Sequence, residues 1–219
     1  MKNFRIESLI LAIGLLLLGI CIQKGFKSFA ERDRSVNVKG LAEMEVPADK
    51  VTWPLMYKSL GNDLNALYDN IKNSNKIITQ FLIEKGIDEK EISNNDNSPY
   101  RYNVTTVITV TSNKVDLVRS LIAEQGELLK RGIAVTGGDY RYNVQYEYTG
   151  LNSIKPQMIE EATKNARQAA EKFAKDSESE LGKIRHANQG QFTITDRDAN
   201  TPYIKKVRVV TTIDYSLED

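Results

Sequence analysis

The chain has 219 residues, with 30 lysines and arginines against 29 aspartates and glutamates, and it contains one histidine and one cysteine. A single cysteine excludes an intrachain disulfide framework, and so few histidines and cysteines argue against a structural zinc site. The formal net charge of +1 gives no general attraction to nucleic acid. The length suits one large domain or two small ones, and an apolar fraction of 41% is enough to build a core.

The first thirty residues differ from the rest of the chain. Residues 9–22 carry no charge, and Lys2 and Arg5 precede them, which is the layout of a secretory signal or a signal anchor. Residues 6–22 form a largely apolar run at the short limit for crossing a bilayer. We therefore expect residues 1–30 to be an N-terminal signal anchor with its linker, and residues 31–219 to form one domain.

Three fates of the N-terminal segment remain open. Small residues within 28–30 suit a signal peptidase, but Lys24 and Lys27 lie where cleavage would occur. Cys21 suggests a lipoprotein, but the bulky Ile20 stands where lipoprotein signals carry a small residue. These features favour an uncleaved anchor over a cleaved signal or a lipoprotein.

The flanking charges give little guidance on orientation. Basic residues stand on both sides of the apolar run, and their count slightly favours a cytoplasmic domain. Long domains cross membranes largely regardless of charge, so the count decides little. Without residues 1–30 the chain has 26 basic and 28 acidic residues, and it contains no cysteine.

Alternating apolar residues predict two strands at the start of the domain. They cover residues 35–46 and 51–57, and they join near residues 47–49. Pro54 cannot donate a hydrogen bond to a neighbouring strand. We therefore expect the second strand to be an edge strand or to bulge there.

Three amphipathic helices are expected in the domain. The first covers residues 64–85, with Asn62 or Asp63 as its N-cap and Gly86 at its C-terminal end. The second runs from a cap at Asn113 to about Arg131, before a glycine. The third begins near Ser153 and is alanine-rich, and we expect Gly182 to end it.

Pairs of strands separate these helices. Residues 100–111 alternate cleanly, residues 133–136 and 140–148 form shorter runs, and residues 184–195 and 205–217 are the last two strands. Runs of two strands between helices favour an α+β fold of antiparallel strand pairs packed with three helices.

One pentapeptide occurs twice. Tyr-Arg-Tyr-Asn-Val stands at residues 100–104 and again at 140–144. An internal duplication of a helix–strand–strand unit and a chance recurrence of a strand pattern both explain it, and two copies are too few for a solenoid. The tyrosines of residues 140–148 indicate core or interface packing rather than a cofactor site.

Two segments carry a family resemblance. Residues 38–49, Val-Lys-Gly-Leu-Ala-Glu-Met-Glu-Val-Pro-Ala-Asp, resemble the opening motif of the SIMPL-domain family. The alanine-rich residues 161–174 and the Leu-Gly at 181–182 resemble a later helix of that family and its end. The resemblance spans about residues 35–217, and the acidic residues 176–180 depart from the usual alanines.

The resemblance implies an α+β domain in a bacterial envelope, behind a signal peptide or an N-terminal anchor. Members are associated with oligomeric assembly and oxidative-stress phenotypes, and the family supplies no shared reaction and no catalytic residues. The resemblance favours an extracytoplasmic domain over the cytoplasmic one that the charges suggest.

Few residues suggest chemistry by themselves. His186 shares its strand parity with apolar neighbours, so we expect it on a buried face as a structural histidine, and Cys21 belongs to the anchor as a packing residue. Glu43, Glu45 and Asp49 lie near a turn without calcium-loop spacing, which indicates a solvated edge. We therefore predict no catalytic, cofactor-binding or metal-binding residues and no cofactor.

The function expected from these features is that of a non-enzymatic protein of the cytoplasmic membrane. We expect a single-pass anchor, an extracytoplasmic SIMPL-like domain, and action through homo-oligomers or an envelope protein partner, in an envelope or oxidative-stress response. Two alternatives stay open: an envelope enzyme or small-ligand binder that uses carboxylate and Tyr groups in a cleft, and an anchored adaptor that faces the cytoplasm.

Overall fold

The computed structural model of the chain describes residues 2–31, 34–100, 103–137 and 142–218. The chain divides into two compact units. The first unit holds residues 1–43, 155–193 and 208–219, and the second holds residues 44–154 and 194–207.

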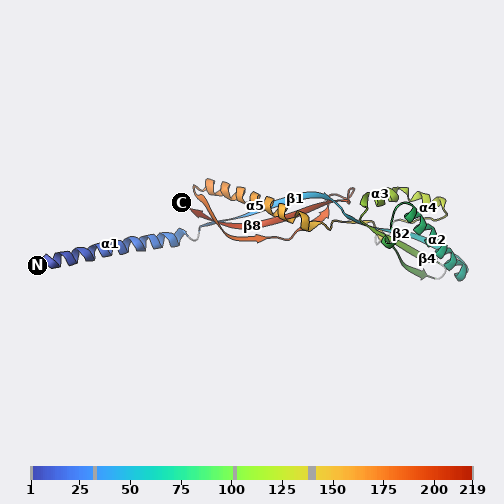
Figure 1. Ribbon diagram of the computed structural model, residues 1–219, viewed down its shortest axis with the longest axis horizontal. Helices are drawn as coiled ribbons and strands as arrows, with labels where there is room; N and C mark the ends of the chain where they lie inside the picture. Colours follow the sequence, from blue (N-terminus) through green and yellow to red (C-terminus); the bar gives the residue numbers. More distant parts are fainter. Residues whose placement is uncertain (1, 32–33, 101–102, 138–141, 219) are drawn as a thin grey trace. The chain divides into compact units, whose positions relative to one another are not determined.

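The N-terminal segment is a long helix, α1, which spans Lys2–Glu31 (Figure 1). Its large apolar side chains in the middle of the helix are 42–68% exposed: Leu11, Ile13, Leu15, Leu16, Leu17, Leu18, Ile20 and Ile22. Within the residues that the structure describes, no helix is both long and apolar enough to cross a membrane. The expected helix is present, and its anchoring role stays a prediction.

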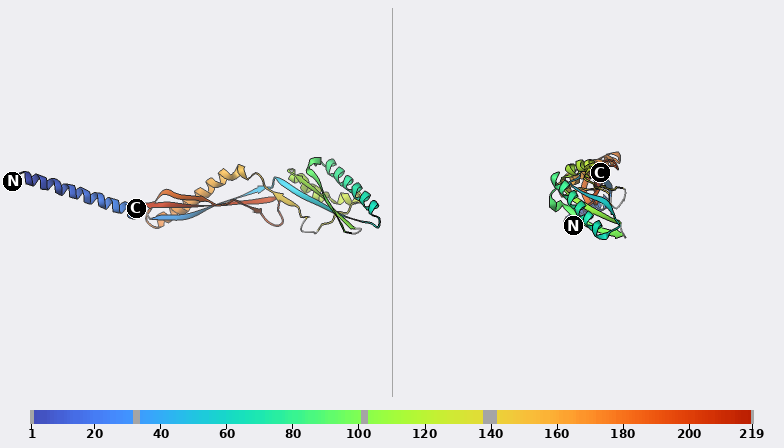
Figure 2. Two further views of the ribbon diagram at one scale, coloured as in Figure 1. Left: turned by 90° about the horizontal axis from the view of Figure 1, so that it is seen from below. Right: turned by 90° about the vertical axis from the view of Figure 1, so that its right-hand side faces the viewer.

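The first unit is built on a sheet with the strand order β1-β8-β6; β7, which pairs with β8, lies almost entirely among the residues of the second unit. The strands span Ser35–Pro47 (β1), Glu180–Gln189 (β6), Thr193–Asp196 (β7) and Ile204–Glu218 (β8). The helix α5, Leu151–Asp176, lies along β1 and β8 (Figure 1, Figure 2).

Small side chains bring α5 close to this sheet. The buried face of the helix consists of one methionine and four alanines, at Met158, Ala162, Ala166, Ala170 and Ala174. Two of these alanines pack with Val38 of β1 and with Ile213 and Tyr215 of β8 in one apolar cluster. The alanines of the segment that the sequence marked as alanine-rich form most of this buried face, whereas Phe173 of the same segment is 58% exposed.

The second unit is built on an antiparallel sheet with the order β3-β4-β2-β5. Its strands span Lys50–Leu60 (β2), Ile92–Tyr100 (β3), Asn103–Ser112 (β4) and Gln145–Glu147 (β5). Its helices are Leu64–Glu84 (α2), the 3₁₀ turn Glu89–Glu91 (η1), Val115–Glu124 (α3) and Gly126–Lys130 (α4).

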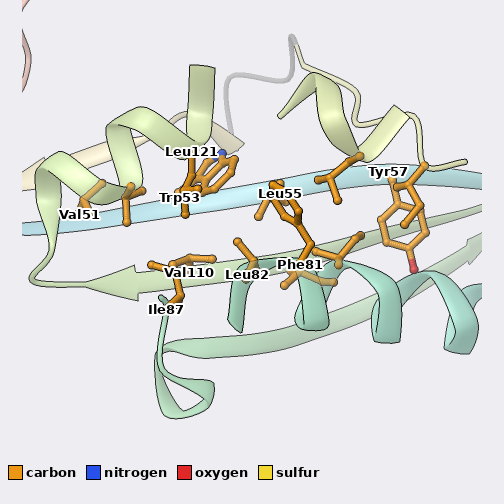
Figure 3. Close-up of a cluster of buried hydrophobic side chains, with 14 residues drawn as sticks. Val51, Trp53, Leu55, Tyr57, Phe81, Leu82, Ile87, Val110 and Leu121 are labelled. Carbon is orange, nitrogen blue, oxygen red and sulfur yellow. The ribbon is translucent and has the colours of Figure 1, made fainter. Parts of the chain in front are cut away.

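The core of the second unit lies between one face of this sheet and its helices. Every second side chain of β2 points into it, and Figure 3 shows these residues meeting Phe81 and Leu82 of α2 and Leu121 of α3. The β2 contribution consists of Val51, Trp53, Leu55 and Tyr57. Alternate side chains of the strand and side chains three or four positions apart on the helices thus pack together in one core.

The α+β class and most of the expected elements are confirmed. Asp63 caps α2 by accepting a hydrogen bond from the N–H of Asn65 at 3.0 Å, and Gly86 follows with φ of 97°. At Pro54 no described strand pairs with β2 on the β5 side, because β5 pairs only with residues 50–52. The missing N–H of the proline therefore leaves no described neighbour unpaired.

Three expectations about the helices are wrong. The N-cap of α3 is Lys114, without a side-chain hydrogen bond, and not Asn113. The second helix is divided into α3 and α4 at Gly126, so the described chain after α1 holds four α-helices rather than three. Glycine weakens a helix interior, which accounts for the break. The third helix ends at Asp176, before Gly182, and the left-handed residue after it is Glu178, with φ of 54°.

The repeated pentapeptide lies partly outside the described residues, since 101–102 and 140–141 belong to its two copies. The strand expected over residues 140–148 is found only as β5. The internal duplication therefore stays a prediction.

Candidate functional site

An open groove runs along the outer face of α2 in the second unit. Its volume is about 860 Å³, and it is lined by α2 residues from Tyr68 to Glu84 and by Asn94 of β3. This volume is within the range of the pockets that bind small molecules. We call this feature the α2 groove.

The amphipathic pattern of α2 produces the wall of the groove. One face of the helix is buried in the core, and the opposite face carries polar side chains with Tyr68 and Ile83, which are 43% and 45% exposed. The sequence predicted the buried stripe but gave no reason to single out the outer face. The signal that marks it is the pair Lys72 and Lys76, at the spacing that places both on one side of a helix.

A hydrogen bond from the core fixes the middle of the groove. The hydroxyl of Tyr57 donates to Oδ1 of Asn75 at 2.6 Å and lies 3.2 Å from the carbonyl oxygen of Ile71. Burial raises the pKa of Tyr57, and a hydrogen bond with Thr106 opposes this shift. The phenol therefore stays protonated and positions Asn75 in the wall.

One of the acids in the groove is paired with a cation, whereas the two central lysines form no ion pair with a described residue. Glu84 accepts hydrogen bonds from Arg131 at 2.9 Å and from Gln80 at 3.1 Å, and Arg131 is the main reason that the pKa of Glu84 is lowered. Lys72 and Lys76 are exposed, and neither forms an ion pair with a described residue. The centre of the groove is therefore positive.

The motif at residues 38–49, which resembles the family's opening motif, packs against α5. A Cβ atom at Gly40 would lie 1.8 Å from the carbonyl oxygen of Ala162 and 2.5 Å from the backbone nitrogen of Ala166. Only glycine allows this approach, and Ala42, also buried, is the small residue that follows on the same face. The Gly-x-Ala pattern thus permits the close packing of helix on strand.

Beside Gly40, α5 also covers the outer edge of β1. The carbonyl of Arg34 accepts a hydrogen bond from Leu217 of β8 at 3.1 Å, so even-numbered residues of β1 direct their backbone groups toward β8. Leu41 points the other way, and its carbonyl accepts a hydrogen bond from the side chain of Asn165 at 2.7 Å. At Leu41, α5 thus occupies a backbone hydrogen-bonding group on the edge of β1 to which another strand could otherwise pair.

The last residue of the motif, Asp49, holds the chain that leads into α5. Its carboxylate accepts hydrogen bonds from the N–H of Thr149 at 2.8 Å, from the N–H of Gly150 at 2.9 Å and from the hydroxyl of Thr149 at 3.1 Å. The motif therefore contributes packing and positioning.

The acidic residues near this turn do not converge. Glu43 lies 3.5 Å from Arg208, and Glu45 lies 3.4 Å from Arg197. Among the described residues no three His, Cys, Asp or Glu side chains form a group that could hold a metal ion. Each acid thus has its own partner, on or near the surface.

The other residues singled out by the sequence are dispersed. His186 is exposed on β6, so its expected burial is wrong, and Cys21 is exposed on α1. Tyr140 lies outside the described residues. Tyr146 packs edge-on against Tyr203 with ring centroids 6.2 Å apart, which is the packing role expected for this segment.

Comparisons with known proteins agree with the motif. A family model described as SIMPL, a protein of unknown function (DUF541), matches residues 36–213. In a search of curated proteins none matches this chain. The matched residues include those that line the α2 groove, and also Gly40 and Asp49, which pack against α5 and fix its start.

Proposed function

The chain belongs to the SIMPL family, and on this premise we propose that it is an extracytoplasmic protein, anchored to the cytoplasmic membrane by α1, that acts by assembly. The observation that carries the proposal is the surface of α1. Four successive leucines, at residues 15–18, are each more than half exposed. Because a helix turns once in 3.6 residues, the four leucines face every direction around it. An apolar surrounding such as a bilayer would bury all of them.

Membrane fractionation tests the anchor. The full chain should stay in the membrane pellet after an alkaline wash, and Leu16→Arg with Leu17→Arg should move it to the supernatant. Leu60→Arg, at a side chain that is 74% exposed on β2, is the matched control and should leave the distribution unchanged. A wild-type chain in the supernatant would rule out the anchor.

A reporter fused to the C-terminus tests the orientation. An alkaline phosphatase fusion should be active and a cytoplasmic fluorescent reporter should be dark if the domain is outside. The reverse pattern would support the anchored cytoplasmic adaptor instead.

We place the action of the protein in binding rather than catalysis, with copies of itself or an envelope protein as partner. Support comes from the open α2 groove, whose central cations have no described partner. The envelope and oxidative-stress role predicts that deletion of the gene slows growth in hydrogen peroxide and that the wild-type chain restores it. Equal growth of both strains would remove this role.

A second function, small-ligand binding, is supported by the composition of the same groove. Tyr68, Asp69 and Glu84 supply the phenol and carboxylates expected for such a site. Native mass spectrometry of the chain purified from membranes should then show an added mass that Tyr68→Ala with Asp69→Ala removes. A single unliganded mass would count against this function.

A further inference from the structure

The α2 groove has two lysines at its centre, and each of its ends combines one large side chain, aromatic or apolar, with an acid. Lys72 and Lys76 stand four residues apart on α2, and like charges at this spacing destabilise a helix slightly. Tyr68 and Ile83 lie toward the two ends, and Asp69 is the acid that partly offsets the cations. Because Glu84 is already held by Arg131, the groove is suited to an occupant that carries carboxylates.

The first unit carries a segment of this kind. Residues 176–180, between α5 and β6, contain Asp176, Glu178 and Glu180, all exposed. None of these three acids forms an ion pair with a described residue. We call this segment the acidic turn.

The backbone holds the acidic turn in a defined shape. The carbonyl of Ala174 accepts hydrogen bonds from the N–H of Ser177 at 3.1 Å and of Ser179 at 2.9 Å. Glu178 adopts φ of 54° between them, a left-handed conformation that non-glycine residues rarely adopt. The carboxylates are thus presented on a closed turn rather than on a free loop.

We propose that the acidic turn of one copy docks in the α2 groove of a second copy. The inference rests on the proposed assembly and adds the two surfaces that meet. Turn and groove are different surfaces, so the contact is head-to-tail: the copy that gives its turn keeps a free groove, and the copy that gives its groove keeps a free turn. Such a contact produces a ring or an open chain rather than a closed pair.

Charge reversal on the full chain in detergent micelles tests the two surfaces separately. The groove variant is Lys72→Glu with Lys76→Glu, and the turn variant is Asp176→Lys with Glu178→Lys. Each should weaken self-association about tenfold or more, measured by sedimentation, because like charges then face each other. Lys164→Glu with Lys172→Glu, two exposed lysines on α5, has the same charge change as the groove variant and is its control, which should assemble as the wild type does.

Mixing the two variants gives the sharpest result. In an equimolar mixture each acidic surface meets a basic one again, so assembly should return to near the wild-type level. Raising NaCl from about 0.1 M to about 1 M should weaken the wild-type assembly, since the screening length falls from about 10 Å to about 3 Å. Circular dichroism checks that each variant is folded, and Lys72→Gln with Lys76→Gln replaces the groove variant if it is not.

The outcomes separate the two proposals. A wild-type chain that assembles while both reversals leave its mass unchanged overturns the docking and leaves assembly in place. The same holds if both variants are folded monomers that do not associate when mixed. A wild-type chain that is monomeric at every concentration overturns the proposed assembly itself.

Discussion

The carboxylate of Asp49 accepts a hydrogen bond from the backbone N–H of Gly150 at 2.9 Å, across 101 residues of sequence. The same carboxylate binds the N–H and the hydroxyl of Thr149. Ser153, in the first turn of α5, in turn donates from its N–H to the carbonyl of Gly150 at 3.0 Å. Asp49 therefore fixes the point from which α5 starts.

Replacing Asp49 tests this role. Asp49→Ala should lower the free energy of unfolding by about 2 kcal/mol, because hydrogen bonds to a charged group are each worth roughly 1.5–3 kcal/mol. Asp49→Asn, which keeps one acceptor oxygen, should cost less. Glu45→Ala, which removes the exposed pair with Arg197, is the control and should cost less than about 1 kcal/mol in urea titrations. Equal losses for Asp49→Ala and Glu45→Ala would contradict the assignment.

Gly40 gives a prediction about packing. Gly40→Ala should destabilise the chain by about 2 kcal/mol or more, because the added methyl meets the backbone of α5 and the helix has to move. Gly61→Ala is the matched control, since its Cβ would meet the side chain of Leu67 at an ordinary 3.5 Å. Thermal melting of both variants measures the difference, and a Gly40→Ala melt equal to that of Gly61→Ala would contradict the close approach.

Replacing Thr211 should raise the free energy of unfolding, in contrast to the two substitutions above. Its hydroxyl oxygen is buried on β8 and has no hydrogen-bond partner among the described residues. Thr211→Val should therefore raise the free energy of unfolding by about 1 kcal/mol, because an unsatisfied buried hydroxyl costs roughly 1–3 kcal/mol. Thr212→Val, at a half-buried neighbour on the other face, should change it less. A loss of stability in Thr211→Val would show that the hydroxyl is bonded.

Tyr57 predicts a dependence on pH. Burial raises its pKa above 10 in the folded chain, so its contribution to stability is fully present below about pH 10 and is lost as the pH rises through the folded value. Tyr57→Phe should cost about 1 kcal/mol at pH 7, by loss of the hydrogen bond to Asn75, and should flatten the alkaline decline. The decline should not vanish, because burial also raises the pKa values of Tyr146 and Tyr215. Urea titrations between about pH 7 and pH 11 measure both effects, and equal alkaline slopes in variant and wild type would contradict the assignment.

The sequence predicted those elements whose two faces see different surroundings. β1 and α2 each have one buried and one largely exposed face, and β2 has one buried face and one that is mostly half-buried, so the spacing of their apolar residues reveals the element. β6 is an edge strand that is exposed almost throughout, and it offers no such pattern. The parity that His186 shares with Ile184 misled because Ile184 is itself 51% exposed, so an apolar residue at that parity does not mark a buried face.

The candidate site was less accessible to sequence reasoning. Asp49 was interpreted as part of a solvated acidic edge, because no local pattern shows a contact with residues about a hundred positions away. The α2 groove lies on the polar side of an amphipathic helix, which usually faces solvent. Its two lysines stand out only once Glu84 is seen to be paired with Arg131.

Sedimentation of the full wild-type chain in detergent micelles over a range of concentrations tests the central claim, assembly, most directly. The account predicts a protein mass that rises above that of one 24.7 kDa chain as the concentration increases. A mass of one chain at every concentration would contradict it.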